Sequence, residues 1–285
     1  MGAMAGAAKE RILQVVGVCR FSLIGRGDWL AYRGKKDSEL EAIYEERAAT
    51  LFAPDRIESR LAKFEHLTLR SMQGQTDQDF RFVVCASDMM PAPYRARLAA
   101  LCREVPQVEL RFFPPTHVID AQRAIFDELG LDYAETIQFR LDDDDCLFSG
   151  YVRRLRDAGK IMDKHKQFAV SFPDVLYSIT DGPNAGVYKW YAPFFSAGPA
   201  IRHPSQSVYG YGHFAIPRRM PSYMHPSFYA LATFDGSNDS APNFARILKR
   251  EFIRPKPEEL DRIVSRNFDF LGEEGLRIAG LSTAG

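Results

Sequence analysis

The stretch Ile137-Gln138-Phe139-Arg140-Leu141-Asp142-Asp143-Asp144-Asp145 decides the fold. Its first five residues alternate between apolar and polar side chains, which is typical of a half-buried strand, so the four aspartates follow where that strand ends. Adjacent carboxylates repel one another, and Arg140 offsets only part of their charge. A divalent cation would relieve the repulsion best, because hard cations prefer several oxygen ligands. The alternative is a solvated acidic turn, which is what most charge runs are.

Outward from this stretch, strand and helix patterns alternate through the first half of the chain. Strands are expected at 12–21, 80–86, 108–113 and 136–141, and helices at 38–51, from Pro54, from Pro91, at 118–129 and at 151–160. This alternation predicts right-handed βαβ units and a mostly parallel sheet flanked by helices, an α/β fold. Polar side chains follow the strands at Arg20-Phe21, at Ser87-Asp88 and at the aspartates. Carboxyl ends of parallel strands share one edge of the sheet, where ligands bind.

The second half of the chain gives a weaker pattern. A strand at 167–172 precedes a Gly-, Pro- and Tyr-rich segment at 181–226, and helices are expected at 241–251 and 257–267. We therefore expect an α+β half with long loops, and loops of that length are uncommon unless functional. No linker is evident. The domain prediction is a flexible stretch at 1–11 and one domain at 12–285, with a nucleotide-sugar-binding half (12–160) and an acceptor half (161–285).

Composition restricts the class of protein. The chain has 285 residues, and its 37 basic residues equal its 37 acidic ones. This balance argues against a protein that holds nucleic acid by bulk charge. The four cysteines form no CxxC pair, so we expect reduced thiols and a cytoplasmic protein rather than a zinc site. No stretch approaches the length of a transmembrane helix, although contact with a membrane surface stays open.

The acidic run favours metal-assisted chemistry on a diphosphate. Two carboxylates spaced D-x-D can hold Mg²⁺ or Mn²⁺ while the cation bridges phosphates and stabilises the charge of a leaving group. The first strand is followed neither by a Walker-type loop ending in Lys-Ser/Thr nor by G-x-G-x-x-G. A P-loop NTPase and a dinucleotide dehydrogenase are therefore disfavoured.

Several of these elements together resemble a known family, described as "putative rhamnosyl transferase", which belongs with the GT-A-fold, family 2-like glycosyltransferases. The resemblance rests on Arg20-Phe21-Ser22, Leu67 to Met72, Gln75-Thr76-Asp77, Phe80 to Asp88 and Gln138 to Asp145. The run FRLDDDD is the more specific element. The resemblance covers residues 12–160 well and the rest weakly. It implies a GT-A-like fold, a nucleoside diphosphate sugar donor of the UDP, dTDP or GDP type, and Mn²⁺ or Mg²⁺.

The resemblance also assigns roles to single residues. Asp142 would face the ribose and the metal, Asp144 would be the main metal ligand, and Asp145 would be a further ligand or support one. Arg20, Phe21, Asp88 and Arg140 would contact the nucleotide. His225 is a candidate third metal ligand, because GT-A enzymes often recruit a His from the C-terminal half; the alternative is a structural hydrogen bond.

The acceptor half must supply the acceptor site and the catalytic base. An inverting transferase needs a carboxylate that takes the proton of the acceptor hydroxyl. We favour Asp239 over Asp174 and Asp235; its alternative role is a turn with a helix N-cap before Pro242. Phe194 to Gly198 is expected beneath the donor sugar, because Gly permits close backbone approach. The aromatic residues at 190–223 suit sugar stacking and core packing equally.

The sequence thus predicts a metal-dependent glycosyltransferase that moves a sugar, rhamnose by the family name, to a glycan, lipid-linked or protein acceptor. One alternative is a nucleotidyltransferase that uses a nucleoside triphosphate and releases pyrophosphate. The other is a non-catalytic carbohydrate-binding protein, which would bind sugar without a cation.

Overall fold

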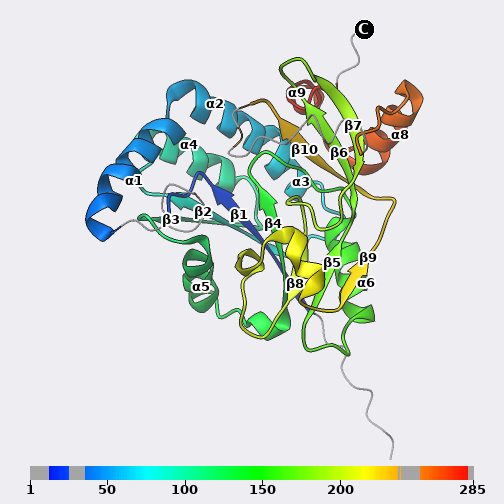
Figure 1. The fold of residues 1–285 in the computed structure, drawn as a ribbon, viewed down its shortest axis with the longest axis horizontal. Coiled ribbons are helices and arrows are strands. Elements are labelled where there is room, and N and C mark those ends of the chain that lie inside the picture. The colour runs from blue at the N-terminus through cyan, green and yellow to red at the C-terminus, as the bar shows by residue number, and fades with distance from the viewer. Residues whose placement is uncertain (1–12, 26–35, 237, 239–250, 282–285) are drawn as a thin grey trace, which may run out of the picture.

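The computed structural model describes residues 13–25, 36–236, 238 and 251–281, and within them seven strands form the central sheet (Figure 1). These strands are β1 (Gln14–Phe21), β2 (Arg81–Ser87), β3 (Val108–Phe113), β4 (Thr136–Asp142), β5 (Phe168–Ser171), β8 (Ala200–Arg202) and β9 (Ser222–Met224). Their order is β3-β2-β1-β4-β8-β5-β9. Strands β3, β2, β1 and β4 are parallel, whereas β8 is antiparallel to both β4 and β5. The predicted α/β fold with a mostly parallel sheet is confirmed.

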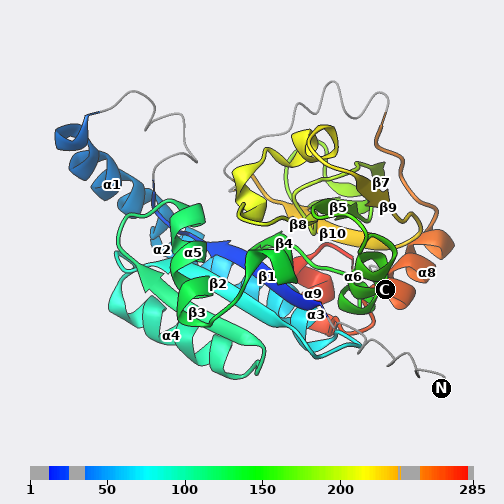
Figure 2. The same cartoon turned by 90° about the horizontal axis from the view of Figure 1, so that it is seen from below.

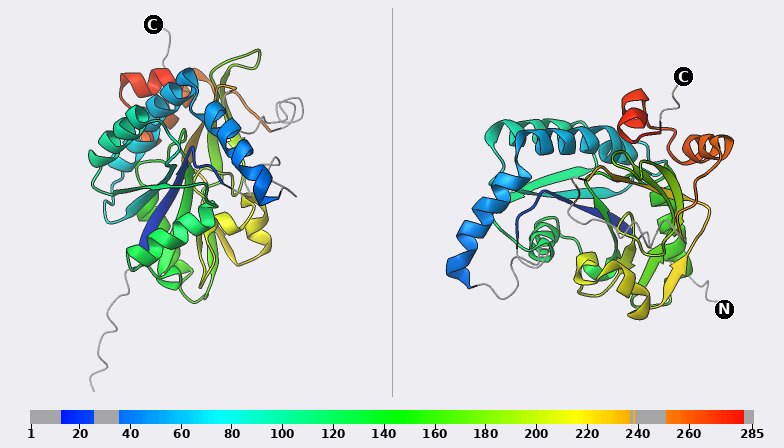
Figure 3. Two further views of the ribbon diagram at one scale, coloured as in Figure 1. Left: turned by 90° about the vertical axis from the view of Figure 1, so that its left-hand side faces the viewer. Right: turned by 45° about the horizontal axis from the view of Figure 1, so that its top comes forward.

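Helices cover both faces of the parallel part. They are α1 (Asp37–Leu51), α2 (Pro54–Lys63), α3 (Arg70–Gln73), α4 (Ala92–Arg103), α5 (Val118–Glu128) and α6 (Tyr151–Ile161), with a π-helical turn at Phe64–Leu69 that joins α2 to α3 and a 3-10 turn at Tyr133–Glu135 before β4. Apolar residues of α2, α4 and α6 share one core with β1 and β4, and those of α5 share another with β1 and β2. Figure 3 shows the sheet between these two layers.

A second, smaller sheet stands beside the first (Figure 2). In the described residues it contains β6 (Asp174–Ile179), β7 (Gly186–Tyr191) and β10 (Tyr229–Phe234), in the order β10-β6-β7. Helices α8 (Pro257–Asn267) and α9 (Glu273–Ile278) contribute to the core beneath it. Two 3-10 helices, η4 (Val208–Gly210) and η5 (His213–Arg218), lie between β8 and β9.

The two sheets join directly after the aspartates. Cys146 donates its N–H to the carbonyl of Leu231 in β10 at 2.8 Å, and Leu231 returns the bond at 2.9 Å. Both side chains are buried in one core with Leu176 of β6. The end of β4 is therefore fixed to the second sheet by backbone bonds as well as by packing.

The segment at 181–226 departs from the expectation of long loops, because it contains β7, β8, β9 and both 3-10 helices. The expected helix at 257–267 is α8, whereas 241–250 of the expected helix at 241–251 lies outside the described residues. Among the helices that the structure describes, none is long and apolar enough to cross a membrane.

Candidate functional site

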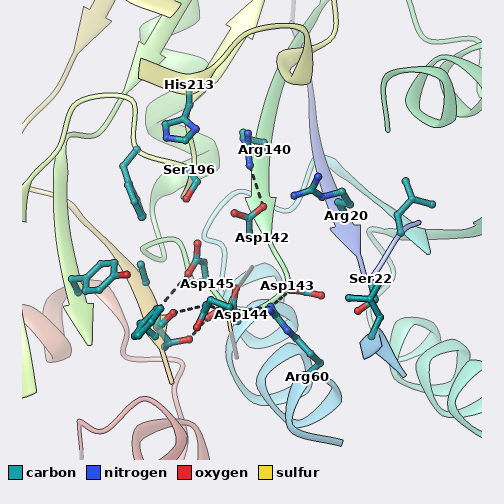
Figure 4. A pocket seen from close by; sticks show the side chains of 18 of the residues that line it. Arg20, Ser22, Arg60, Arg140, Asp142, Asp143, Asp144, Asp145, Ser196 and His213 are labelled. Atoms are coloured by element: carbon teal, nitrogen blue, oxygen red, sulfur yellow. Dashed lines mark hydrogen bonds and ion pairs between the residues drawn. The ribbon is translucent and has the colours of Figure 1, made fainter. Parts of the chain in front are cut away.

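A cavity of about 470 Å³ opens at the carboxyl ends of β1 and β4 and reaches across to the second sheet (Figure 4). Two groups of side chains make up much of its lining. One side, here called the charged wall, consists of Arg20, Arg60, Arg140 and Asp142 to Asp145. The other side, here called the aromatic wall, consists of Tyr177, Trp190, Phe195, Phe214 and Phe234.

Asp142 is the most accessible carboxylate of the acidic run that lines the cavity. Its side chain is 29% exposed, and one oxygen lies 3.3 Å from the guanidinium of Arg140. The register of β1 against β4 places Arg20 directly beside it. Burial opposes ionisation, but the charges of Arg140 and Arg20 outweigh it and lower the pKa of Asp142. Asp142 therefore presents an ionised carboxylate to the cavity.

Asp143 and Asp144 are buried and share one cation, Arg60 of α2. The Nη1 atom of Arg60 lies 2.6 Å from Oδ1 of Asp143 and 3.0 Å from Oδ2 of Asp144. The same Oδ2 accepts a hydrogen bond of 2.7 Å from Asn238. Burial, strengthened by the neighbouring Asp143, raises the pKa of Asp144 to about 6, although Arg60 opposes the shift. Asp144 is thus a carboxylate with an incompletely balanced charge.

Asp145 is also buried, and it is held by contacts with Thr233 and Thr68. Its carboxylate accepts a long bond of 3.4 Å from the N–H of Thr233 in β10, and its carbonyl accepts one from the hydroxyl of Thr68. Burial and the charge of Asp144 raise its pKa well above the ordinary value. The acidic run therefore ends inside the molecule, between the two sheets.

Arg140 owes its position to a tyrosine from the second half of the chain. Its guanidinium lies 4.6 Å from the ring centre of Tyr209 in η4, a cation–π contact. The Tyr209 hydroxyl in turn donates to the carbonyl of Val18 in β1 at 3.1 Å. Arg140 is thus held beside Asp142.

The structure brings five of the predicted site residues to one cavity: Arg20, Arg140, Asp142, Asp144 and Asp145. Phe21 is different, because its fully buried ring packs edge-on against Phe64 in the core. Its side chain cannot flank a nucleotide, and the prediction for it needs correction on that ground.

Two further predicted residues, Asp88 and His225, are not among the described residues that line the cavity. Asp88 is exposed after β2, where its N–H donates to the carbonyl of Phe113. His225 contacts the carbonyl of its neighbour Pro226 and packs against Phe228. Asp239 lies outside the described residues, so its role as base stays a prediction.

The sequence reasoning missed Arg60, although the pattern of α2 carried a signal for it. Ile57, Leu61 and Phe64 mark the buried face of this helix, and Arg60 falls on the same face. A buried arginine is rare unless it is paired, so a charge on an apolar helix face predicts an acidic partner elsewhere in the chain.

No group of three or more His, Cys, Asp or Glu in the described part of the chain is arranged to hold a metal ion. The carboxylates of the charged wall supply oxygen ligands, but any cation there would need further ligands from another source.

The sequence matches the family described as "putative rhamnosyl transferase" over residues 14–247. The chain belongs to this family. The match extends beyond the N-terminal half that carries the resemblance and runs through the charged wall and β10. Membership places the protein among the glycosyltransferases and confirms the predicted family and enzyme class. No curated protein matches the sequence.

Solved structures give remote likenesses. A "putative nucleotide-diphospho-sugar transferase" from Desulfovibrio desulfuricans G20 aligns at 13% identity with a TM-score of 0.38 and covers 95% of this chain and 98% of that one. TarS 1–349 from S. aureus in complex with UDP-GlcNAc aligns at 10% identity with a TM-score of 0.40, over 94% of this chain and 70% of that one. A "putative glucose-1-phosphate thymidylyltransferase" from Bacillus anthracis aligns at 10% identity with a TM-score of 0.40, over 85% and 98%. The chain covers 23% of one TarS structure and 60% of TarS 1–349 in another.

Proposed function

We propose that this glycosyltransferase binds a nucleoside diphosphate sugar along the charged wall, together with Mn²⁺ or Mg²⁺, and transfers the sugar to an acceptor. The family description suggests rhamnose as the sugar. The observation that carries the proposal is Asp142, an accessible and ionised carboxylate at the end of β4 with Arg20 and Arg140 beside it. Carboxyl ends of parallel strands are where α/β sheets bind their ligands.

The donor set fits a hard divalent cation that binds together with the substrate. The available ligands are carboxylate oxygens, which Mg²⁺ and Mn²⁺ prefer. Arg60 and Asn238 both contact Oδ2 of Asp144, so we expect the other oxygen, Oδ1, to be the ligand. Fewer than three protein ligands suffice where phosphates complete the coordination, as is usual for Mg²⁺ sites. Bound there, a cation would neutralise charge on the leaving diphosphate.

The residues of the charged wall then have separate tasks. Asp142 and Asp144 would hold the cation, with Asp145 behind them. Arg20 and Arg140 present guanidinium groups, whose planar forks suit phosphate oxygens. Arg60 keeps Asp143 and Asp144 in place by direct ion pairs. Asp239 remains the predicted base for the acceptor hydroxyl, whereas His225 would need to leave its present contacts to become a metal ligand.

The test is a thermal-shift panel of UDP, GDP, dTDP and CDP, each with Mn²⁺, with Mg²⁺ and with EDTA. A ligand that binds only the folded state raises the melting temperature. We expect one nucleotide to act in a cation-dependent way, and Asp142→Asn to weaken its binding at least about tenfold, because a contact to a charged group contributes about 1.5–3 kcal/mol. Asp120→Asn on α5, 62% exposed, is the matched control.

Three results would contradict the proposal. If no nucleotide raised the melting temperature, the charged wall would not be a donor site. Release of pyrophosphate from a nucleoside triphosphate would favour a nucleotidyltransferase. Sugar binding that EDTA does not affect, with no nucleotide binding, would favour a carbohydrate-binding protein.

We also propose a cytoplasmic location. The four cysteines are unpaired and buried in the described structure, and cytosolic proteins keep their thiols reduced. Labelling of the denatured protein, purified anaerobically, should find four free thiols; a disulfide would contradict this location.

A further inference from the structure

Four rings of the aromatic wall form one connected row together with the imidazole of His213. Trp190 of β7 packs edge-on against Phe195 at 5.1 Å between ring centres, and Tyr177 of β6 lies 5.9 Å from Trp190. Phe195 reaches His213 at 6.3 Å, and His213 lies 4.3 Å from Phe214 in η5. Tyr177 is nearly buried, whereas Phe214 is 53% exposed at the end of the row. The row therefore runs from the interior of the cavity to its rim.

The backbone is strained where this wall turns toward the cavity. Phe194 has a φ of 58°, although its bulky ring is fully buried, and its N–H donates to the hydroxyl of Ser171 at 2.8 Å. Left-handed backbone at such a residue costs about 1–2 kcal/mol and persists where the surroundings impose it, often at functional sites. The strained residue is followed by Phe195 and Ser196, both of which line the cavity.

The aromatic wall offers different chemical groups from those of the charged wall. Besides its rings, its segments bring the hydroxyl of Ser196 and the imidazole of His213 to the cavity. Figure 4 shows both side chains among those that line the pocket with Asp142. Burial, with the nearby charge of Arg140, lowers the pKa of His213 to about 4, so the imidazole is neutral at physiological pH. Aromatic faces with a few neutral hydrogen-bonding groups suit an uncharged, hydroxyl-rich ring better than a phosphate.

We propose that the aromatic wall is the acceptor subsite and that the acceptor presents an uncharged sugar ring to it. This inference rests on the proposed function, because it takes the charged wall as the donor site. The ring faces of Trp190 and Phe214 would carry the sugar, with Ser196 and His213 as hydrogen-bonding partners. A sugar held there would lie beside Asp142, next to the donor.

A fluorescence titration tests this. The chain has two tryptophans, Trp29 and Trp190, so Trp29→Phe leaves Trp190 as the sole reporter. The probes are methyl glycosides of rhamnose, glucose, galactose and N-acetylglucosamine, added to protein with saturating nucleoside diphosphate and Mn²⁺. We expect at least one glycoside to change the emission, and Phe214→Ala to weaken that binding about tenfold, the effect of losing one aromatic contact.

The control variant is Tyr191→Ala, since Tyr191 follows Trp190 on β7, is 59% exposed and is not among the cavity-lining residues. It should leave glycoside binding unchanged. Nucleotide binding, measured separately, should be unchanged in both variants, and a failure of nucleotide binding in the parent protein would count against the proposed function instead.

Three outcomes would overturn the acceptor proposal while leaving the donor site intact: binding of none of the glycosides, glycoside binding that Phe214→Ala does not weaken, or nucleotide binding that Phe214→Ala does weaken. The last outcome would assign the aromatic wall to the nucleotide base of the donor. Octyl phosphate is a further probe, and its binding in place of every glycoside would assign the wall to a lipid acceptor.

Discussion

The two walls of the cavity differ in the side chains that they present: one is charged and the other is aromatic and uncharged. The charged wall places four carboxylates against three arginines and buries most of them. The aromatic wall brings apolar rings and a neutral imidazole to the same space. The charged wall is suited to a polyanion with a cation, and the aromatic wall to a neutral ring. The two walls therefore differ in the kind of ligand that each is suited to bind.

The largest expected effect comes from removing the shared cation of the charged wall. Arg60→Ala removes the ion pairs that Arg60 makes with the buried Asp143 and Asp144, and breaking a buried pair costs about 3–5 kcal/mol. Urea denaturation at pH 7 should show this loss in the free energy of unfolding. Arg56→Ala is the matched control on the same helix and cavity, and it should cost less than about 1 kcal/mol. Equal losses in the two variants would contradict the assigned role of Arg60.

The next prediction concerns His213, which lies next to the aromatic wall, and the dependence of stability on pH. Unfolded His takes up a proton near pH 6.5, but the folded residue does so only near 4. Between these values the unfolded chain binds more protons, so this residue lowers the stability as the pH falls. His213→Gln removes this effect. Between pH 7 and pH 5, its free energy of unfolding should rise by on the order of 2 kcal/mol relative to that of the wild type.

This gain is read from urea denaturation of both proteins at each pH, and the difference between them cancels the contribution of other groups. A constant offset between wild type and His213→Gln would mean that His213 is not kept neutral.

The smallest effect, that of Ser22→Gly, concerns backbone strain, which occurs next to each wall. Ser22, after β1, has a φ of 44°, and Phe194 has one of 58°. Ser22→Gly should stabilise the protein by about 0.5–1 kcal/mol, because Gly adopts this conformation at little cost. Ser22→Ala keeps the strain and should not stabilise. Phe194→Gly should instead destabilise by at least about 3 kcal/mol, because the lost packing of a buried ring exceeds the relief. Thermal melts of the three variants check this order.

Much of the charged wall could be predicted from sequence, because its elements follow simple periods. The alternation before Asp142 places the acids at the end of β4, and the apolar run before Arg20 places that residue beside them. Helix α5 begins at Val118, as expected, and α8 spans the expected 257–267. Local sequence patterns determine these elements, so predicting them requires no information about the rest of the chain.

The short strands of the second half and the long-range contacts of the site were not predictable in the same way. Strand β8 has three residues and β9 has three, which is too short for a period to show. Their positions depend on β5, which lies between them and pairs with both. The pairing of Asp144 with Arg60 joins residues far apart in sequence, and the buried position of Phe21 depends on Phe64. Such contacts are tertiary, and a single sequence gives only the buried charge on α2 as a hint.

The bonds between Cys146 and Leu231 have a consequence for engineering. They tie the residue after the last aspartate to the middle of β10, so the geometry of the acidic run is inherited partly from the second half of the chain. A chimera that exchanged the residues after 160 between relatives would replace one partner of these bonds and disturb the charged wall as well. A redesign of the aromatic wall should therefore keep β6 and β10 from the parent and change only the segments that carry Trp190, Phe195 and Phe214, at 186–196 and 213–214.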